Sequence, residues 1–138
     1  MKYIITALLL IFTSPIYSQI IKKPTNMECL IYSSYKESRG GTVEQTRAVI
    51  DVITNRSIAY NESVCQVIRK PNQFPYARFG IKKVYDKEFL TLFMNAYTMP
   101  SLLPRDYLFF NTKKFKWCGK TRKIDKMYFC KLKTMEEK

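Results

Sequence analysis

Glu37 is the residue whose type and setting best suit proton-transfer chemistry. It lies at the end of a helical stretch with apolar periodicity, just before the helix-breaking pair Gly40 and Gly41. A carboxyl group at a helix C-terminus lies at the negative end of the helix dipole, which disfavours its ionised form, and partial burial raises its pKa further. Such a group can serve as a general acid near neutral pH. The alternative is an ordinary solvated glutamate, because charged side chains are mostly exposed.

The composition restricts acid–base chemistry to carboxylates, with tyrosine and lysine as less favoured groups. The chain has no histidine, so mechanisms with a histidine base, including Cys-His and Ser-His pairs, are excluded. It also has no Cys-x-x-Cys pair, so we expect no zinc site and no metal or organic cofactor. Glu44 is the nearest other carboxylate, but its place in the first turn of the next helix favours a structural role.

Capping motifs and apolar periodicity predict helices in the first two thirds of the chain. Thr25–Glu28 and Thr42–Gln45 match the capping-box pattern at two helix starts. The second helix is apolar on more than one side, so we expect it to be central. The expected helices begin at or after Thr25, Thr42, Ser63 and Asp86, and they end near Ser38, Ile58, Arg69 and Pro100.

Short aromatic runs replace the helical periodicity after Pro104. Tyr107–Asn111 and Met127–Leu132 have the composition of strands, and we expect the basic residues 112–126 between them to form a loop or hairpin. Residues 72–83, earlier in the chain, are expected to be a loop. Helices followed by a small sheet predict an α+β fold with a short C-terminal antiparallel sheet.

The first 18 residues match a signal peptide. Lys2 supplies the positive charge, and the apolar run Ile4–Phe12 is too short to span a bilayer. Ser18 is a small residue suited to cleavage before Gln19. We therefore expect residues 19–138 to form one exported domain, periplasmic or extracellular. An uncleaved membrane anchor is the alternative.

The four cysteines all lie in the mature part of the chain, where export predicts up to two disulfides with three possible pairings. Cys118 and Cys130 flank a glycine-containing turn region and could join the two sides of a hairpin. Cys29 and Cys65 would then connect two helices. The alternative for Cys65 is a buried, unpaired small apolar residue.

The chain is strongly basic, with a net charge of +13. Removal of residues 1–18, in which Lys2 is the only charge, leaves +12. Such a surplus implies an anionic partner, and export favours the bacterial envelope. Nucleic acid is not expected, because the basic residues are scattered and no nucleic-acid-binding module is recognisable. The alternative is a basic surface that only aids solubility.

Several short blocks occur along the chain in a fixed order. They are Glu37-Ser38-Arg39-Gly40, Asn55-Arg56, Val64-Cys65-Gln66-Val67-Ile68, Gln73-Phe74, Tyr107–Asn111 and Ile124–Phe129. This order resembles the SleB-type cell wall hydrolases, known from spore cortex-lytic enzymes and phage lysins, over about Met27 to Cys130. Gly41 replaces the family's second acidic residue, and Met127 replaces its histidine.

The resemblance implies a lysozyme-like fold and an enzyme that cleaves peptidoglycan between N-acetylmuramic acid and N-acetylglucosamine. Glu37 would be its general acid, and Arg39 would bind a substrate carboxylate, unless it pairs with Glu37 or caps helix carbonyls. Gln73 and Phe74 would contact a sugar, with core packing as the alternative for Phe74. Tyr107 and Asn111 would line the opposite wall of the cleft, with Asn111 favoured over Phe110.

A single supported carboxylate favours a lytic transglycosylase, in which the C6 hydroxyl of the muramic acid attacks C1. A hydrolase that uses water would need a second carboxylate at a defined separation. The alternatives are therefore a muramidase and a secreted cationic domain without enzymatic activity. We expect a monomer that contacts peptidoglycan glycan strands and the anionic envelope, and a phage-encoded origin stays open.

Overall fold

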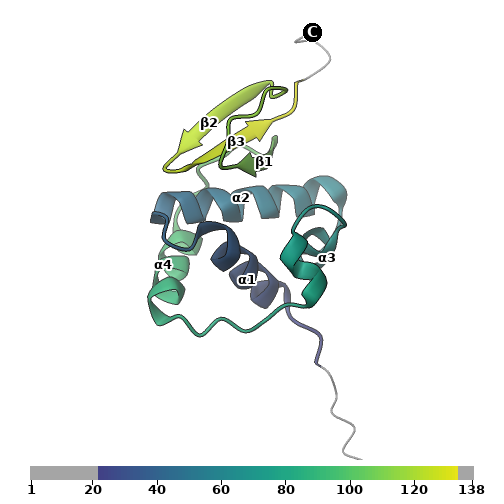
Figure 1. Cartoon of the computed structure of the whole chain (residues 1–138), viewed down its shortest axis with the longest axis vertical. Coiled ribbons are helices and arrows are strands. Elements are labelled where there is room, and N and C mark those ends of the chain that lie inside the picture. Colours follow the sequence, from purple (N-terminus) through teal and green to yellow (C-terminus); the bar gives the residue numbers. More distant parts are fainter. Residues whose placement is uncertain (1–21, 134–138) are drawn as a thin grey trace, which may run out of the picture.

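The computed structural model describes residues 22–133 (Figure 1). Its elements are α1 (Asn26–Ser38), α2 (Val43–Tyr60), α3 (Val64–Arg69), the 3₁₀ helix η1 (Pro75–Phe79), α4 (Lys87–Thr98), β1 (Tyr107–Asn111), β2 (Lys120–Ile124) and β3 (Met127–Lys131). The α+β fold, with helices first and a C-terminal antiparallel sheet, is confirmed. The expected signal peptide, residues 1–18, lies outside the described residues. Within 22–133, no helix is both long and apolar enough to cross a membrane.

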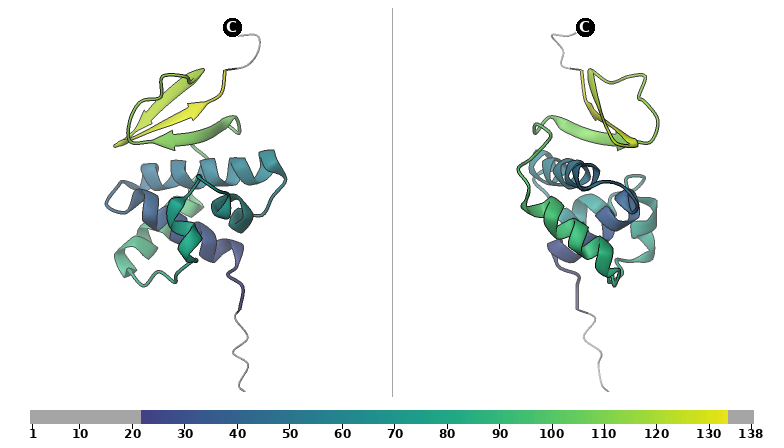
Figure 2. Two further views of the ribbon diagram at one scale, coloured as in Figure 1. Left: turned by 45° about the vertical axis from the view of Figure 1, so that its right-hand side comes forward. Right: turned by 90° about the vertical axis from the view of Figure 1, so that its left-hand side faces the viewer.

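Helix α2 is the centre of the fold, as its apolar sequence predicts. The sheet lies on one side of α2, and α1, α3 and α4 lie on the other (Figures 1 and 2). Val49, Val52 and Ile53 of α2 are fully buried. Because α2 contacts both layers, it can hold side chains from the helices and from the sheet around one point.

The two predicted capping boxes differ in the structure. At α1, Thr25 Oγ1 accepts a hydrogen bond from Glu28 N, and the Glu28 carboxylate accepts one from Thr25 N. At α2, Thr42 Oγ1 accepts from Gln45 N at 3.1 Å, but the reciprocal bond is replaced. The Gln45 side chain instead accepts from Lys126 N at 3.2 Å and so binds the β2–β3 turn. A tertiary contact thus replaces the second half of this capping box.

The sheet has the strand order β1-β3-β2, with all neighbours antiparallel. Strand β2 lies within the segment that the sequence left as loop or hairpin. Its residues are mostly charged and exposed, so it has no apolar alternation by which it could be recognised. Such charged sequences are common on edge strands, where they discourage pairing with other chains. The register between β1 and β3 shifts between Tyr107 and Phe109, so Leu108 forms a bulge.

Three polar side chains of α2 hold residues 102–108, which lead into β1. Asp51 accepts hydrogen bonds from the backbone N–H groups of residues 102 and 103, at 2.7 and 3.1 Å. Asn55 donates to the carbonyl oxygens of residues 104 and 107, at 2.9 and 3.1 Å. Arg56 Nε donates to the carbonyl oxygen of residue 108. The buried polar residues of α2 therefore set the position of β1.

Two disulfides link the elements. Cys29–Cys65 joins α1 to α3, and Cys118–Cys130 joins the β1–β2 connection to β3. This is the pairing considered from the sequence, so Cys65 is not an unpaired apolar residue.

We expect protein recovered from an oxidising compartment to contain both bonds. Each disulfide lowers the intact mass by two hydrogen atoms, so mass spectrometry before and after reduction counts the bonds directly. Four free thiols in freshly exported protein would contradict export to an oxidising compartment.

Candidate active site

Glu37 lies in the last turn of α1 and is half-buried. The helix ends one residue later, and Gly40 follows with φ +79°, a conformation that side chains disfavour. The chain therefore turns away directly after Glu37. This is the helix-end position that the sequence predicts.

Two side chains from other elements face the Glu37 carboxyl group. The Tyr76 hydroxyl of η1 forms a hydrogen bond with it, and the Arg56 guanidinium of α2 interacts with it electrostatically. The Ser33 carbonyl oxygen, 3.5 Å from Tyr76 Oη, is a second acceptor for the same hydroxyl proton. The site thus combines one carboxyl group, one hydroxyl group and one cation from three separate elements.

Burial raises the pKa of Glu37 above its ordinary value, which agrees with the direction expected from the sequence. The Tyr76 hydrogen bond and the Arg56 charge both lower the pKa of Glu37, but burial has the larger effect. Burial also raises the pKa of Tyr76, and the Glu37 charge adds to this shift. Tyr76 therefore keeps its proton at neutral pH and acts as a donor.

Arg56 is fixed among aromatic rings. Its side chain is buried, and its Cζ lies 5.5 Å from the ring centroid of Phe74, 5.4 Å from that of Phe109 and 5.8 Å from that of Phe110. These distances allow cation–π attraction, which offsets part of the cost of burying the guanidinium. Burial lowers the pKa of Arg56, but arginine stays charged at neutral pH. A permanent positive charge is therefore held beside Glu37.

Aromatic packing also holds Tyr76. Its ring lies edge-on to Tyr32 at 5.7 Å and contacts Phe74 at 5.9 Å. Phe74 in turn contacts Phe110, at 6.1 Å. These ring contacts position Tyr76, whose hydroxyl interacts with the Glu37 carboxyl group.

Phe74 and Tyr107 pack in the core. Their exposed fractions are 3% and 4%. Phe74 therefore has the core position that was the alternative for it, and its only link to the site among the described contacts is its ring contact with Arg56 and Tyr76. The Tyr107 carbonyl oxygen accepts a hydrogen bond from Asn55. Neither ring offers an open face to a sugar in this structure.

The other three predicted binding residues are exposed or half-buried. Arg39 is exposed and pairs with Asp86 at 3.6 Å, so it does not oppose the raised pKa of Glu37 as an ion pair with it would. Gln73 is half-buried in the turn before η1. Asn111 is exposed at the end of β1, where its side chain accepts a hydrogen bond from Lys113 N at 3.3 Å. Of the six predicted residues, the structure brings together Glu37 and Phe74, both of which interact with Arg56.

The sequence assigned no role in the site to Tyr76, or to Arg56 beyond its place in the Asn55-Arg56 block. The sequence contains a signal by which the burial of Arg56 could have been predicted. Its helix is apolar on several sides, and a charged side chain that is buried in such a helix needs partners. Tyr76 had no such signal, since it is one of several aromatic residues in a segment expected to be a loop.

Among the described residues, no carboxylate contributes to the pKa shift of Glu37. Glu44 is exposed in the first turn of α2, which fits the structural role expected of it. A Cβ atom at Gly41 would lie 2.5 Å from the Gln45 amide nitrogen, so the space for a second acidic side chain is filled. Within residues 22–133, no group of three or more His, Cys, Asp or Glu side chains is placed to hold a metal ion.

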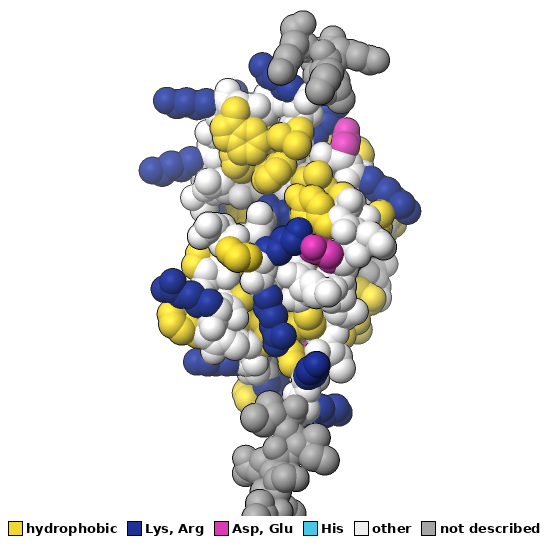
Figure 3. Space-filling model, turned by 90° about the vertical axis from the view of Figure 1, so that its right-hand side faces the viewer, with side chains coloured by type: hydrophobic (Ala, Val, Ile, Leu, Met, Phe, Trp, Pro, Cys, Tyr) yellow, Lys and Arg dark blue, Asp and Glu magenta, His cyan; other side chains and the backbone are white. Residues whose placement is uncertain are grey.

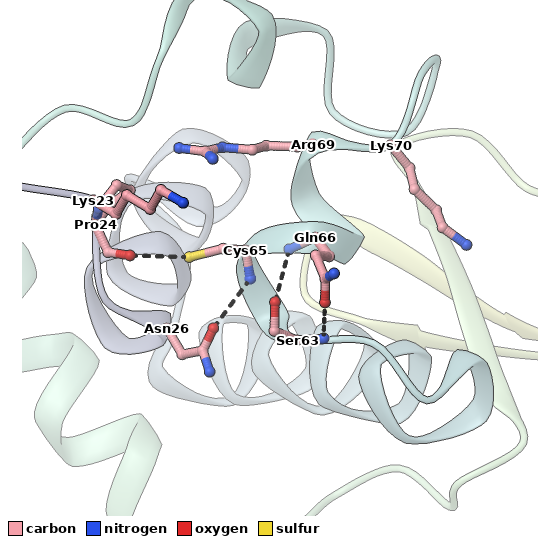
Figure 4. A pocket seen from close by; sticks show the side chains of 8 residues that line it. All are labelled: Lys23, Pro24, Asn26, Ser63, Cys65, Gln66, Arg69 and Lys70. Carbon is pink, nitrogen blue, oxygen red and sulfur yellow. Dashed lines mark hydrogen bonds between the residues drawn. The ribbon is translucent and has the colours of Figure 1, made fainter.

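A separate basic hollow lies between the start of α1 and α3 (Figure 4). Several of its polar side chains are used locally: Ser63 and Gln66 form a capping box, and Asn26 accepts a hydrogen bond from Cys65 N at 3.3 Å. Lys70 pairs with Glu62 at 3.0 Å. Because Glu37 lies at the other end of α1, this hollow is not part of the Glu37 site.

We expect Tyr76→Phe to raise the pKa of Glu37 further, which moves its titration to higher pH. The change removes a hydrogen bond that stabilises the Glu37 carboxylate, so the pKa of Glu37 rises and its acid form persists to higher pH. Nuclear magnetic resonance titration of the Glu37 carboxyl carbon, in the wild type and in the variant, measures this change. A shift to lower pH, or no shift, would show that Tyr76 does not control the protonation of Glu37.

Comparisons of this chain with protein-family models, curated proteins and solved structures found no match. The functional argument therefore rests on the residues of the site. These are a half-buried carboxyl group with a raised pKa, a tyrosine hydroxyl and a buried arginine.

Proposed function

We propose that this protein cleaves the glycan strand of bacterial peptidoglycan between N-acetylmuramic acid and N-acetylglucosamine, with Glu37 as the general acid. The observation that carries the proposal is the state of the Glu37 carboxyl group. Burial raises its pKa, and the Tyr76 hydroxyl and the Arg56 guanidinium interact with it. A general acid must keep its proton near working pH and release it to the leaving oxygen. The sequence resemblance to SleB-type hydrolases supports the same reaction.

A lytic transglycosylase fits this site better than a hydrolase does. Glu37 would donate its proton to the bridge oxygen as the bond between that oxygen and C1 breaks. The C6 hydroxyl of the same muramic acid would attack C1 and return its proton to the Glu37 carboxylate, which yields a 1,6-anhydro sugar. No second carboxylate is needed, and Arg56 would stabilise the Glu37 anion between the two proton transfers.

The charge of the molecule supports an envelope partner. Figure 3 shows one face on which lysine and arginine side chains are spread over helices and sheet, with few acidic side chains among them. A net charge of +13 attracts anionic polymers at long range. The two disulfides agree with an oxidising compartment, so we propose a periplasmic or extracellular location.

Mass spectrometry of the soluble products from purified peptidoglycan tests the proposal. A lytic transglycosylase releases 1,6-anhydro muropeptides, and a Glu37→Gln digest should lack them. Muropeptides with reducing ends would instead indicate a muramidase. Binding to the wall without any soluble product would indicate a cationic envelope-binding domain and would refute the enzymatic proposal.

A further inference from the structure

A row of aromatic rings leads from Arg56 to the surface of the sheet. The Phe109 ring, 5.4 Å from Arg56 Cζ, lies edge-on to Trp117 at 5.2 Å. Trp117 also lies edge-on to Phe115 at 5.1 Å. Trp117 is 50% exposed, and Phe109 and Phe115 are half-buried. The row therefore starts at the cation beside Glu37 and ends at an exposed indole ring. Figure 3 shows hydrophobic side chains gathered over the sheet.

The same connection between β1 and β2 forms a basic hollow with the strands next to it. The lining includes Lys114, Lys116, Lys120, Lys123, Phe115 and Tyr128, and it contains no acidic residue. The Lys123 ammonium lies 5.5 Å from the Tyr128 ring centroid. Aromatic rings and lysines together suit a ligand that has flat apolar faces and negative charges.

The connection is held firmly against β3. The Cys118–Cys130 disulfide ties it to the strand, and Gly119 N donates to the Lys131 carbonyl oxygen at 3.0 Å. A Cβ atom at Gly119 would lie 2.8 Å from Lys133 Cα, so the two backbones approach closely there. A surface fixed in this way loses little conformational entropy when it binds a ligand.

We infer that Phe109, Phe115 and Trp117, together with the lysines of the hollow that Phe115 also lines, form a second binding surface for an anionic glycan strand. The rings stack on pyranose faces, and the lysines pair with carboxylates of the lactyl groups and stem peptides. The inference rests on the proposed function, because the occupant it names is the glycan strand proposed there as substrate. The lysines of the hollow complement the negative charge of that strand.

Trp117 is the only tryptophan in the chain, so its fluorescence reports on this surface alone. The Glu37→Gln variant of the exported chain, titrated with soluble muropeptide oligomers, allows binding to be measured without cleavage. We expect a saturable change in Trp117 emission and weaker quenching by acrylamide. Oligomer binding seen by calorimetry with unchanged emission and unchanged quenching would overturn the inference.

Substitution of the indole ring tests its contribution. In the Glu37→Gln background, Trp117→Ala is expected to weaken oligomer binding about tenfold, the size of other ring-stacking contacts, and Trp117→Phe to weaken it less. Tyr97→Ala is the matched control. Tyr97 is a 41%-exposed ring of α4, on the other side of α2 from the sheet, and its removal should leave binding unchanged. Equal losses for the Tyr97 and Trp117 variants, or none for Trp117→Ala, would overturn the inference.

A charge-matched pair of double variants separates a local lysine site from net charge. Lys114→Gln with Lys116→Gln removes two charges from the hollow, and Lys82→Gln with Lys87→Gln removes two exposed charges elsewhere. We expect only the first pair to weaken binding by severalfold at moderate salt. Equal weakening would mean that only the overall charge attracts the glycan and would overturn the local site.

Two further outcomes distinguish this inference from the proposed function and from another partner. If the wild-type protein releases no soluble product but the oligomers still change Trp117 emission, the surface stands and the enzymatic proposal fails. If a mixed-sequence single-stranded oligonucleotide binds more tightly than the oligomers and quenches Trp117, the surface is a nucleic-acid site and the inference is wrong.

Discussion

Replacement of the Glu37 carboxyl group by an amide, in Glu37→Gln, is expected to lower the rate of glycan cleavage about 10²–10⁴-fold, the usual contribution of a positioned general acid. The amide has nearly the same shape and can still accept a hydrogen bond from Tyr76. It lacks only the transferable proton. Far-ultraviolet circular dichroism should therefore be unchanged while the release of soluble muropeptides falls.

Glu44→Gln is the matched control for this variant. Glu44 is an exposed carboxylate at the start of α2 and has no place in the proposed mechanism, so its variant should retain wild-type activity. Loss of less than about tenfold in the Glu37→Gln variant would refute general-acid catalysis by Glu37. Similar losses in both variants would point to a general dependence on negative charge.

The same Glu37→Gln variant should gain stability relative to the wild type as the pH rises. The pKa of Glu37 is raised in the folded state, so the folded protein holds this proton more tightly than the unfolded chain. This contribution to the free energy of unfolding is complete below the unfolded pKa and is lost as the pH rises through the folded pKa. Glutamine does not titrate. Melting temperatures from about pH 4 to about pH 8 should therefore diverge in favour of the variant, and a constant difference would contradict a raised pKa.

Asp51→Ala is expected to lower the free energy of unfolding by about 3–5 kcal/mol, the usual cost of removing one partner from a buried ion pair. Asp51 is 3% exposed and pairs with Arg47 at 2.8 Å. Its carboxylate also accepts two backbone hydrogen bonds from residues 102 and 103. The substitution leaves two N–H groups without their acceptor. It also removes the only carboxylate among the described residues that is paired with the mostly buried Arg47 guanidinium, which keeps its hydrogen bonds to the carbonyl oxygens of residues 96 and 97. Chemical denaturation measures the loss.

Asp106→Ala provides the contrast, because Asp106 is an exposed carboxylate whose ion pair with Lys131 spans 3.5 Å. Exposed pairs contribute about 0–1 kcal/mol, so this variant should lose little stability. Equal losses at both positions would show that the burial of Asp51 does not matter. Because Asp51 also orders the chain leading into β1, its variant should lose activity at temperatures where it is still folded.

The helix limits of this fold follow from local chemistry that is visible in the sequence. Thr25, Thr42 and Asp86 act as N-caps, as expected, and Ser63, the expected first residue of the third helix, is its N-cap. Helix α2 runs to Tyr60, two residues beyond the expected end, because Asn61 adopts the left-handed conformation and stops it there. Strand β2 lies in a segment for which the sequence predicts only a loop or hairpin, because nothing in its charged sequence indicates that it pairs with β3. Pairing between distant segments depends on the partner and not on local propensity.

The site was predictable only where a residue had a local reason for its position. Glu37 has one, since a helix end and two glycines follow it. The partnership with Arg56 and Tyr76 depends on how α2 and η1 pack against α1, which no local pattern records. The grouping of Trp117 with Phe109 and Phe115 is not visible in the sequence for the same reason, because these rings meet only when residues 112–119 fold back toward the sheet.

The turn between α1 and α2 also constrains how this chain can change. A side chain at Gly41 would displace the Gln45 amide, which is 4% exposed and anchors Lys126 N of the β2–β3 turn. Acquisition of an acidic residue at position 41 therefore requires a compensating change at position 45, or the sheet loses a contact with α2. Among homologues of this protein, the two positions should covary, with glycine at the first accompanied by a long amide at the second.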